Sequence, residues 1–173
     1  VHKANVLPLT DGLFRDCVLE AVAAARREGC ELEVSEMLVD LAALRMASEP
    51  ERFETVVTTN LFGDILSDVA AYWMGGMGLA PSLNWGDGVA LAEPVHGSAP
   101  DIAGQDKANP IATILSLAMM LRYSLDLSGE ADAIEQAVVR VLDKGYRTGD
   151  IASAGTSVVG TREMGRIIKE ELK

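Results

Sequence analysis

The sequence has 173 residues, of which 49% are hydrophobic and 24% are charged. This composition is typical of an ordinary globular protein with one sizeable core, and it excludes a disordered or fibrous chain. A formal net charge of −11 would repel a phosphate backbone, and the fifteen Lys and Arg residues are scattered along the chain, so both features argue against nucleic acid as a partner.

The hydrophobic pattern alternates between short β-rich stretches and longer stretches of helical period. Strands are predicted over residues 1–7, 31–34, 54–59 and 89–91. Helices are predicted over residues 10–29, from a cap at Ser35 through Leu44, and over 61–73, 110–124, 131–144 and 160–170, with Asn60 as a further cap. Glycines 75, 76 and 78 with Pro81 mark a boundary or hinge between two parts of the chain. Residues 93–109 are predicted to form a polar loop, and a loop of this length is uncommon without a binding role. The alternation predicts an α/β fold.

The sequence also predicts the compartment in which the protein works. Cys17 and Cys30 stand outside any CxxC or Cys/His cluster, which indicates neither a disulfide framework nor a zinc site and fits a reducing cytosol. The most apolar stretch, residues 111–121, is shorter than the roughly 20 residues that a membrane span needs, and no signal peptide is found. We therefore expect a cytoplasmic protein without membrane contact. Because the sequence opens on Val1 directly inside a motif, we also expect it to be a fragment.

Two aspartates four residues apart give the first sign of a metal site. In residues 60–68 (NLFGDILSD), Asp64 and Asp68 would project from one face of a helix, one turn apart. Like charges at this spacing repel, and a divalent cation bound to both carboxylates relieves the repulsion. Oxygen ligands alone favour Mg²⁺ or Mn²⁺ over zinc. A solvated acidic face explains the spacing at least as well, and Asp40, inside an apolar run, is informative only if it lies near the pair.

Five blocks of the sequence together resemble one enzyme family. They are residues 1–7 (VHKANVL), 39–40 (VD), 60–68, 93–104 (EPVHGSAPDIAG) and 108–110 (ANP). The same blocks occur in the same order in the β-decarboxylating dehydrogenases, which act on 3-isopropylmalate, homoisocitrate, isocitrate, or tartrate and D-malate. The resemblance implies the carboxy-terminal portion of a layered αβα fold of the isopropylmalate dehydrogenase type, which is not a Rossmann fold. It places residues 1–75 in the substrate and dimer-interface domain and residues 76–173 in the cofactor-binding domain.

The resemblance further implies a homodimer in which two subunits share each active site. Lys3 matches the lysine that exchanges a proton with the substrate hydroxyl, and Asn5 matches a residue near the nicotinamide. Both are offered to the neighbouring subunit's site, and so is Asp40, which matches a metal ligand. Asp64 and Asp68 match ligands from the subunit that holds the cofactor. The family's substrate-clamping arginines and its catalytic tyrosine lie upstream of residue 1. A solvated surface lysine and a turn asparagine are the plain alternatives for the first two residues.

The resemblance also implies that the loop 93–109 binds the adenosine part of NAD. The residues that match cofactor contacts are Glu93, His96, Gly97, Ser98, Ala99, Asp101 and Asn109. In that reading Gly97 permits close approach of the backbone, and His96 offers an aromatic face to adenine. Asp101 accepts hydrogen bonds from both ribose hydroxyls and would repel a 2′-phosphate, so NAD is expected rather than NADP. A loop histidine bonded only to protein is the alternative for His96.

The expected reaction is the NAD-dependent oxidative decarboxylation of a 2-hydroxy acid with Mg²⁺ or Mn²⁺. Residues 121–125, 147–151 and 159–165 resemble isopropylmalate dehydrogenases, whereas residues 1–7 with 10–14 are more like isocitrate and homoisocitrate enzymes. We expect 3-isopropylmalate, in leucine biosynthesis, as the substrate, with homoisocitrate, isocitrate, D-malate and tartrate as alternatives. Two other classes stay open. They are a non-catalytic regulatory subunit of a heteromeric isocitrate dehydrogenase and a carboxylate-metal hydrolase without a nucleotide.

Overall fold

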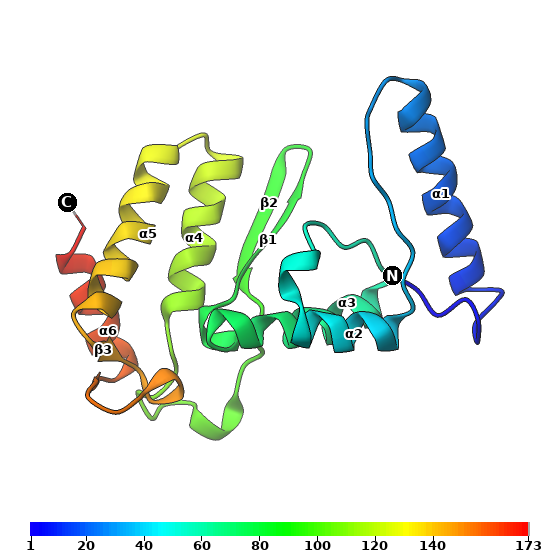
Figure 1. Ribbon diagram of the computed structural model, residues 1–173. Helices are drawn as coiled ribbons and strands as arrows, with labels where there is room; N and C mark the ends of the chain where they lie inside the picture. The colour runs from blue at the N-terminus through cyan, green and yellow to red at the C-terminus, as the bar shows by residue number, and fades with distance from the viewer. Residues whose placement is uncertain (173) are drawn as a thin grey trace. The chain divides into compact units, whose positions relative to one another are not determined.

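The computed structural model describes residues 1–172, which combine helices with two small sheets. These residues divide into two compact units, the first from Val1 to Tyr72 and the second from Trp73 onward (Figure 1). The boundary expected from the glycines at 75 and 76 lies just beyond this division. The substrate and cofactor roles of the two parts stay predictions. Within the described residues, no helix combines the length and the apolar character that a membrane crossing needs.

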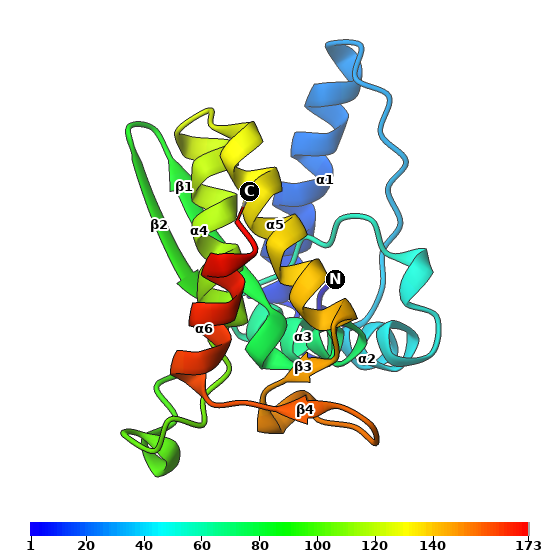
Figure 2. The same cartoon turned by 90° about the vertical axis from the view of Figure 1, so that its left-hand side faces the viewer.

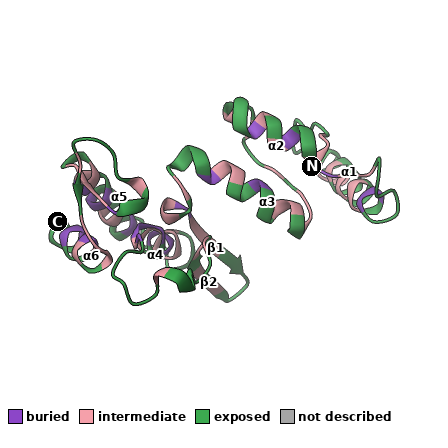
Figure 3. Cartoon of the chain, turned by 90° about the horizontal axis from the view of Figure 1, so that it is seen from below, coloured by how far each residue is buried: buried purple, intermediate pink, exposed green. Residues whose placement is uncertain are grey.

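The core of the first unit lies between two helices. The unit contains α1 (Asp11–Arg27), α2 (Val39–Ser48) and α3 (Asn60–Ala71). Ala42 and Met46 of α2 pack with Leu66 of α3, and partly buried neighbours such as Phe53 and Val56 close the cluster. Figure 3 shows the buried residues of α2 and α3 on the sides where the two helices face each other. By contrast α1 stands apart from them, beside the segment that follows it (Figures 1 and 2).

Three extended segments of the first unit lie side by side, although none of them is a strand. The N–H of His2 donates to the carbonyl of Met37 at 3.2 Å, and the N–H of Val39 donates to the carbonyl of His2 at 3.0 Å. This is an isolated parallel bridge between His2 and Leu38. On the other side, the amino group of Val1 donates to the carbonyl of Val57 at 2.7 Å. The strands predicted over 1–7, 31–34 and 54–59 are therefore wrong for the described residues, because one bridge and one hydrogen bond do not make a ladder.

The second unit is built in layers. A hairpin of β1 (Pro81–Gly86) and β2 (Val89–Pro94) is antiparallel, with Pro81 opposite Pro94 and Gly86 opposite Val89. It packs on α4 (Ile111–Ser124), which packs on α5 (Ser128–Asp143), and α6 (Thr161–Glu170) follows (Figure 1). The core lies among the three helices. Its buried members are Ile111, Ala137, Val138, Val141, Met164, Ile167 and Ile168.

Several predicted boundaries of the elements need correction. The structure adds β1, which the glycines and Pro81 concealed, and a two-residue parallel pair of β3 (Tyr146–Arg147) with β4 (Ser157–Val158) (Figure 2). The second helix begins at Val39 after an extended Leu38, so Ser35 does not cap it. Asn60 is the first residue of α3 rather than its cap, and α5 begins at Ser128 rather than at residue 131. The helices at 11–27, 111–124 and 161–170 lie within three residues of the predicted bounds.

Candidate functional site

The first group of candidate residues follows the carboxyl ends of the three extended segments. Lys3 follows the segment of residues 1–2, Asp40 follows the segment that ends at Leu38, and α3 follows the segment of residues 54–59. In α/β proteins, ligands bind outside the carboxyl ends of parallel strands. The parallel bridge between His2 and Leu38 here brings a cationic side chain and the beginning of α2 to one edge.

Lys3 and Asp40 form an ion pair across this edge. The Nζ of Lys3 donates to Oδ1 of Asp40 at 2.5 Å, with 24% of the lysine side chain and 66% of the aspartate side chain exposed. The hydrogen bond from Lys3 is the main cause that lowers the pKa of Asp40, and the N–H at the start of α2 adds to the effect. The aspartate is therefore held in its charged form, which is the form that binds a cation. The structure joins these two predicted residues, which are 37 positions apart in the sequence.

Asp64 and Asp68 lie one helical turn apart on α3, and both are exposed. Their carboxylates are thus available to a ligand from outside the unit. Asn5 is exposed as well, in the turn that follows Lys3. Within residues 1–172, no three Asp, Glu, His or Cys side chains come together as a metal site. Asp40, Asp64 and Asp68 are accordingly not gathered around one point by a single copy of the described chain.

The second group of candidates lies in the polar loop after the hairpin. His96 is half-buried, and its Nδ1 lies 2.9 Å from the carbonyl oxygen of Gly97. Ala99 adopts a left-handed conformation with φ of 43°, which costs a non-glycine residue about 1–2 kcal/mol. It begins the short helix Pro100–Ile102, where the side chain of Asp101 is exposed and its carbonyl accepts a hydrogen bond from Gln105 at 2.7 Å. This places the Asp101 carboxylate in solvent, next to a turn that also exposes Gly97 and Ser98.

Asn109 ends this loop and is buried, with 7% of its surface exposed. Its Oδ1 accepts the N–H of Ile111, the first residue of α4, at 3.0 Å, and its Nδ2 donates to Oδ2 of Asp150 at 3.1 Å. The hydroxyl of the fully buried Thr148 donates to the other oxygen of Asp150 at 2.5 Å. Gly78 packs beside this network, where an added Cβ would lie 2.6 Å from Oδ2 of Asp150. The side-chain oxygen and nitrogen of Asn109 are thus both hydrogen-bonded within the protein.

Glu93 is the remaining candidate, and it is the second-to-last residue of the hairpin strand β2. Its side chain is exposed and its Oε1 accepts a hydrogen bond from Asn84 at 3.3 Å. Its carbonyl accepts from the hydroxyl of Ser116 at 2.9 Å, which ties the strand to α4. Glu93 is therefore fixed at its backbone, while its exposed carboxylate is bonded to Asn84.

Sequence reasoning missed Asp11, Asp106, Thr148 and Asp150. Asp106 has a positive φ of 56° and its Oδ1 accepts the N–H of Arg162 at 2.9 Å, so it binds the loop to the beginning of α6. Asp11 is buried and binds the backbone of Lys3. Asp11, Asp106 and Asp150 each hydrogen-bond to a residue at least eight positions away, and no local pattern signals such a partner. The pair of positive-φ positions at 99 and 106, without glycine, is the kind of local strain found at ligand-binding loops.

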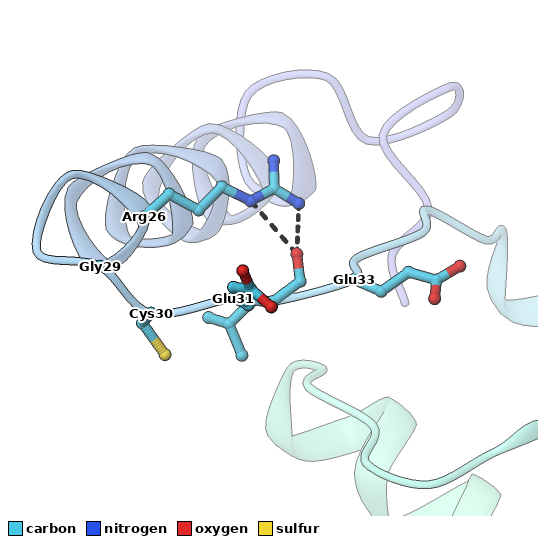
Figure 4. Close-up of a pocket in the computed structure, with 6 residues that line it drawn as sticks. Arg26, Gly29, Cys30, Glu31 and Glu33 are labelled. Carbon is cyan, nitrogen blue, oxygen red and sulfur yellow. Dashed lines mark hydrogen bonds between the residues drawn. The ribbon is translucent and has the colours of Figure 1, made fainter.

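A shallow hollow lies elsewhere in the first unit, at the carboxyl end of α1. Its lining residues are Arg26, Gly29, Cys30, Glu31, Leu32 and Glu33. Arg26 closes one side by donating to the carbonyl of Leu32 at 2.5 and 3.2 Å (Figure 4). None of the predicted site residues lines it. Because its arginine is already bonded to the carbonyl of Leu32, this hollow has the features of a loop surface rather than of a binding site.

Comparison with known proteins agrees with these features. The family model described as isocitrate/isopropylmalate dehydrogenase matches residues 1–168. The 3-isopropylmalate dehydrogenase of Thermosynechococcus vestitus is 53% identical over 99% of this chain and 46% of its own length, and that of Synechocystis is 56% identical over 95% and 44%. The crystal structure of isocitrate dehydrogenase from Methylococcus capsulatus matches with a TM-score of 0.87 and 44% identity, over 99% of this chain and 49% of that one. The chain spans about half the length of the curated relatives it matches. These likenesses confirm the family resemblance and the α/β fold class, of which this chain holds a part.

Proposed function

Because the chain belongs to the isocitrate/isopropylmalate dehydrogenase family, we propose that it is part of an NAD-dependent enzyme that oxidises and decarboxylates 3-isopropylmalate, as in leucine biosynthesis. The observation that carries the proposal is the pairing of Lys3 with Asp40 at the carboxyl ends of parallel segments. The substrate is favoured by relatives named 3-isopropylmalate dehydrogenase, which are 51–56% identical to this chain.

The carboxylates of the first unit fit a hard divalent cation. Asp64 and Asp68 are exposed on one turn of α3, and Asp40 is held in its charged form. Carboxylate oxygens without nitrogen or sulfur ligands are the donor set of Mg²⁺ and Mn²⁺. When bound, such a cation would supply the positive charge that lowers the pKa of the substrate hydroxyl.

Lys3 is proposed as the group that takes the proton from that hydroxyl. Its Nζ is presented at the same edge as the Asp40 carboxylate, and its side chain is mostly shielded from solvent. An amine held at a fixed position can take such a proton as a general base. The nicotinamide of NAD would accept the hydride from the carbon that carries this hydroxyl, with Asn5 beside the nicotinamide.

The second unit is proposed as part of the cofactor-binding domain. Asp101 exposes a carboxylate that can accept both ribose hydroxyls, and residues 97–99 of the turn before it are exposed and open to adenosine. A carboxylate at the ribose disfavours a 2′-phosphate, which supports NAD over NADP. Glu93, His96, Gly97, Ser98, Ala99 and Asn109 are proposed as the other contacts of the cofactor.

We also propose a homodimer that completes each active site. One copy of the described chain does not gather the three aspartates, so a second copy would bring its own Asp40, with Lys3 and Asn5, to Asp64 and Asp68. In this arrangement the cation between the two copies would offset the repulsion of the two exposed carboxylates, which stand one turn apart on α3.

An isocitrate dehydrogenase is the second candidate. The match to the Methylococcus capsulatus structure favours it, and so does the TDGLF sequence at residues 10–14. A regulatory subunit is disfavoured because Lys3, Asp40, Asp64, Asp68 and Asp101 are all present. A hydrolase without nucleotide would leave the loop of residues 93–109 without a role.

Calorimetry with the full-length protein separates these candidates. NAD is titrated with and without Mn²⁺, and NADH formation is then measured with 3-isopropylmalate, isocitrate, homoisocitrate, D-malate and tartrate. The proposal expects NAD to bind and 3-isopropylmalate to give the highest kcat/KM. NAD binding without turnover of any acid would favour the regulatory subunit, and no NAD binding at all would favour the hydrolase.

A further inference from the structure

Two side chains outside the proposed site bind the backbone on either side of the Lys3 side chain. The N–H of Lys3 donates to Oδ2 of Asp11 at 2.6 Å. The next N–H, that of Ala4, donates to Nδ1 of His2 at 3.1 Å. The two peptide groups that flank the lysine Cα are therefore both held by side-chain acceptors.

Asp11 is well suited to this task. It is 5% exposed, and a carboxylate is rarely so buried unless its oxygens are bound. The residue opens α1, and its own N–H donates to the carbonyl of Leu7 at 3.0 Å, while the N–H of Leu7 donates to the carbonyl of Lys3 at 2.9 Å. The turn from residue 3 to residue 11 is thus closed by hydrogen bonds at both ends.

His2 links this turn to the segment that carries Asp40. Its backbone makes both hydrogen bonds of the bridge to residues 37–39, directly before the aspartate. Since Nδ1 accepts the N–H of Ala4, the ring hydrogen lies on Nε2, which faces Oε2 of Glu36 at 3.2 Å. The side chain is 10% exposed and held on both nitrogens. The backbone of Lys3 and the backbone before Asp40 are therefore fixed relative to each other.

We propose that Asp11 is a positioning residue for Lys3, with His2 as its partner on the other side. The lysine side chain is a flexible four-carbon stem, so a small tilt at its Cα becomes a large displacement at Nζ. A fixed backbone at Lys3 keeps Nζ within 2.5 Å of the Asp40 carboxylate. At this edge Lys3 is proposed to take the proton from the substrate hydroxyl. This inference rests on the proposed function, in which Lys3 touches the substrate.

The test compares two variants of Asp11 in the full-length enzyme. Asp11→Ala removes the acceptor, whereas Asp11→Asn retains an oxygen that can accept the same N–H. Displacement of a reacting group by about 1 Å can lower the rate about a hundredfold. We expect Asp11→Ala to lower kcat about tenfold to a hundredfold with little change in KM for the hydroxy acid or for NAD. We expect Asp11→Asn to restore most of the kcat.

A matched control measures the effect of lost stability alone. The carboxylate of Glu171 is 14% exposed and binds Lys144 at 2.5 Å in the second unit, so Glu171→Ala should lower Tm without lowering kcat. If Asp11→Ala is not recovered folded, His2→Phe replaces it, because a phenyl ring fills the space but offers no acceptor to Ala4.

The outcomes are distinguishable. An active wild type in which Asp11→Ala, or His2→Phe in its place, keeps the wild-type kcat would overturn the inference and leave the proposed function standing. An Asp11→Asn variant as slow as Asp11→Ala would also overturn it, because the charge rather than the backbone hydrogen bond would then be the cause. A wild type that turns over none of the five acids would overturn both the inference and the proposed function.

Discussion

Gly78 packs against the residues that hold Asn109, and Gly78→Ala is therefore expected to weaken both the fold and the binding of NAD. The added Cβ would lie 2.6 Å from Oδ2 of Asp150 and 2.9 Å from Cβ of Asn109. Overpacking of this kind costs about 1–3 kcal/mol. Losing the 3.1 Å hydrogen bond between Asn109 and Asp150 adds about 1.5–3 kcal/mol, and the stiffer unfolded chain offsets about 0.4–1 kcal/mol. The net loss is about 1.5–5.5 kcal/mol, which corresponds to a fall in Tm of about 3–22 °C.

The assay is thermal unfolding of the full-length protein together with the Kd for NAD from calorimetry. Gly165→Ala is the control, because an added Cβ in the middle of α6 meets nothing within 4 Å and removes the cost of a helical glycine, about 0.5–1 kcal/mol. It should raise Tm slightly and leave the Kd unchanged. A Gly78→Ala protein with the wild-type Tm would refute the packing argument. A lowered Tm with an unchanged Kd would show that Asn109 does not support the cofactor site.

Four further predictions follow from the proposed function and the ion pair. Asp64→Asn and Asp68→Asn should each raise the Mn²⁺ concentration needed for half-maximal activity, since an amide cannot restore the lost charge; wild-type metal dependence would show that the residue is not a ligand. Asp101→Lys should shift the preference from NAD towards NADP by about 1–3 kcal/mol, and an unchanged ratio of kcat/KM values would show that the residue does not face the ribose. Because Lys3 lowers the pKa of Asp40, their pairing stabilises the fold above the ordinary pKa of the aspartate and is lost as the pH falls through the lowered value. NMR titration should find that Lys3→Met raises this pKa, and an equal pKa in both proteins would exclude the pairing. The isolated 173-residue chain should form no NADH with any of the five acids, and metal-dependent NADH formation by that chain would contradict the shared site.

The helices were predictable because their information is local. The apolar spacing of α4 and α6 lies within each helix, and the structure places them almost where the pattern does. The hairpin was also predictable, although it was missed. Asp87 and Gly88 form a two-residue loop between paired Gly86 and Val89, and Gly88 has a φ of 76°, which is the typical aspartate-glycine signal for a tight turn. The glycines at 75, 76 and 78 predict a boundary in the same region, and this stronger signal conceals the weaker one of the turn.

The strands of the first unit were not predictable in the same way. Residues 31–34 and 54–59 have the right composition, but a strand also needs a hydrogen-bonded neighbour, and the composition does not say which residues supply it. In the described residues Leu32, Val34 and Val57 remain exposed. The same limit applies to the site. Asp11 and Asp150 act through hydrogen bonds that span 8 and 41 positions, whereas Lys3, Asp40 and Asp101 were reached through the family resemblance.

The proposed shared site has a consequence for assembly. Asp64 and Asp68 repel each other on one turn of α3, by about 0.2–0.5 kcal/mol, and Asp40 of the same chain is bound to Lys3. Because one copy of the described residues does not bring the three aspartates together, a cation held by all of them would need a second copy to bring its Asp40 to the pair. A cation that binds only the dimer stabilises the dimer. By linkage, dimer formation raises the affinity for the cation by the same factor. Metal affinity and dimer affinity would then be two measurements of one coupling free energy, and the weak repulsion on α3 would be relieved only when both partners are present.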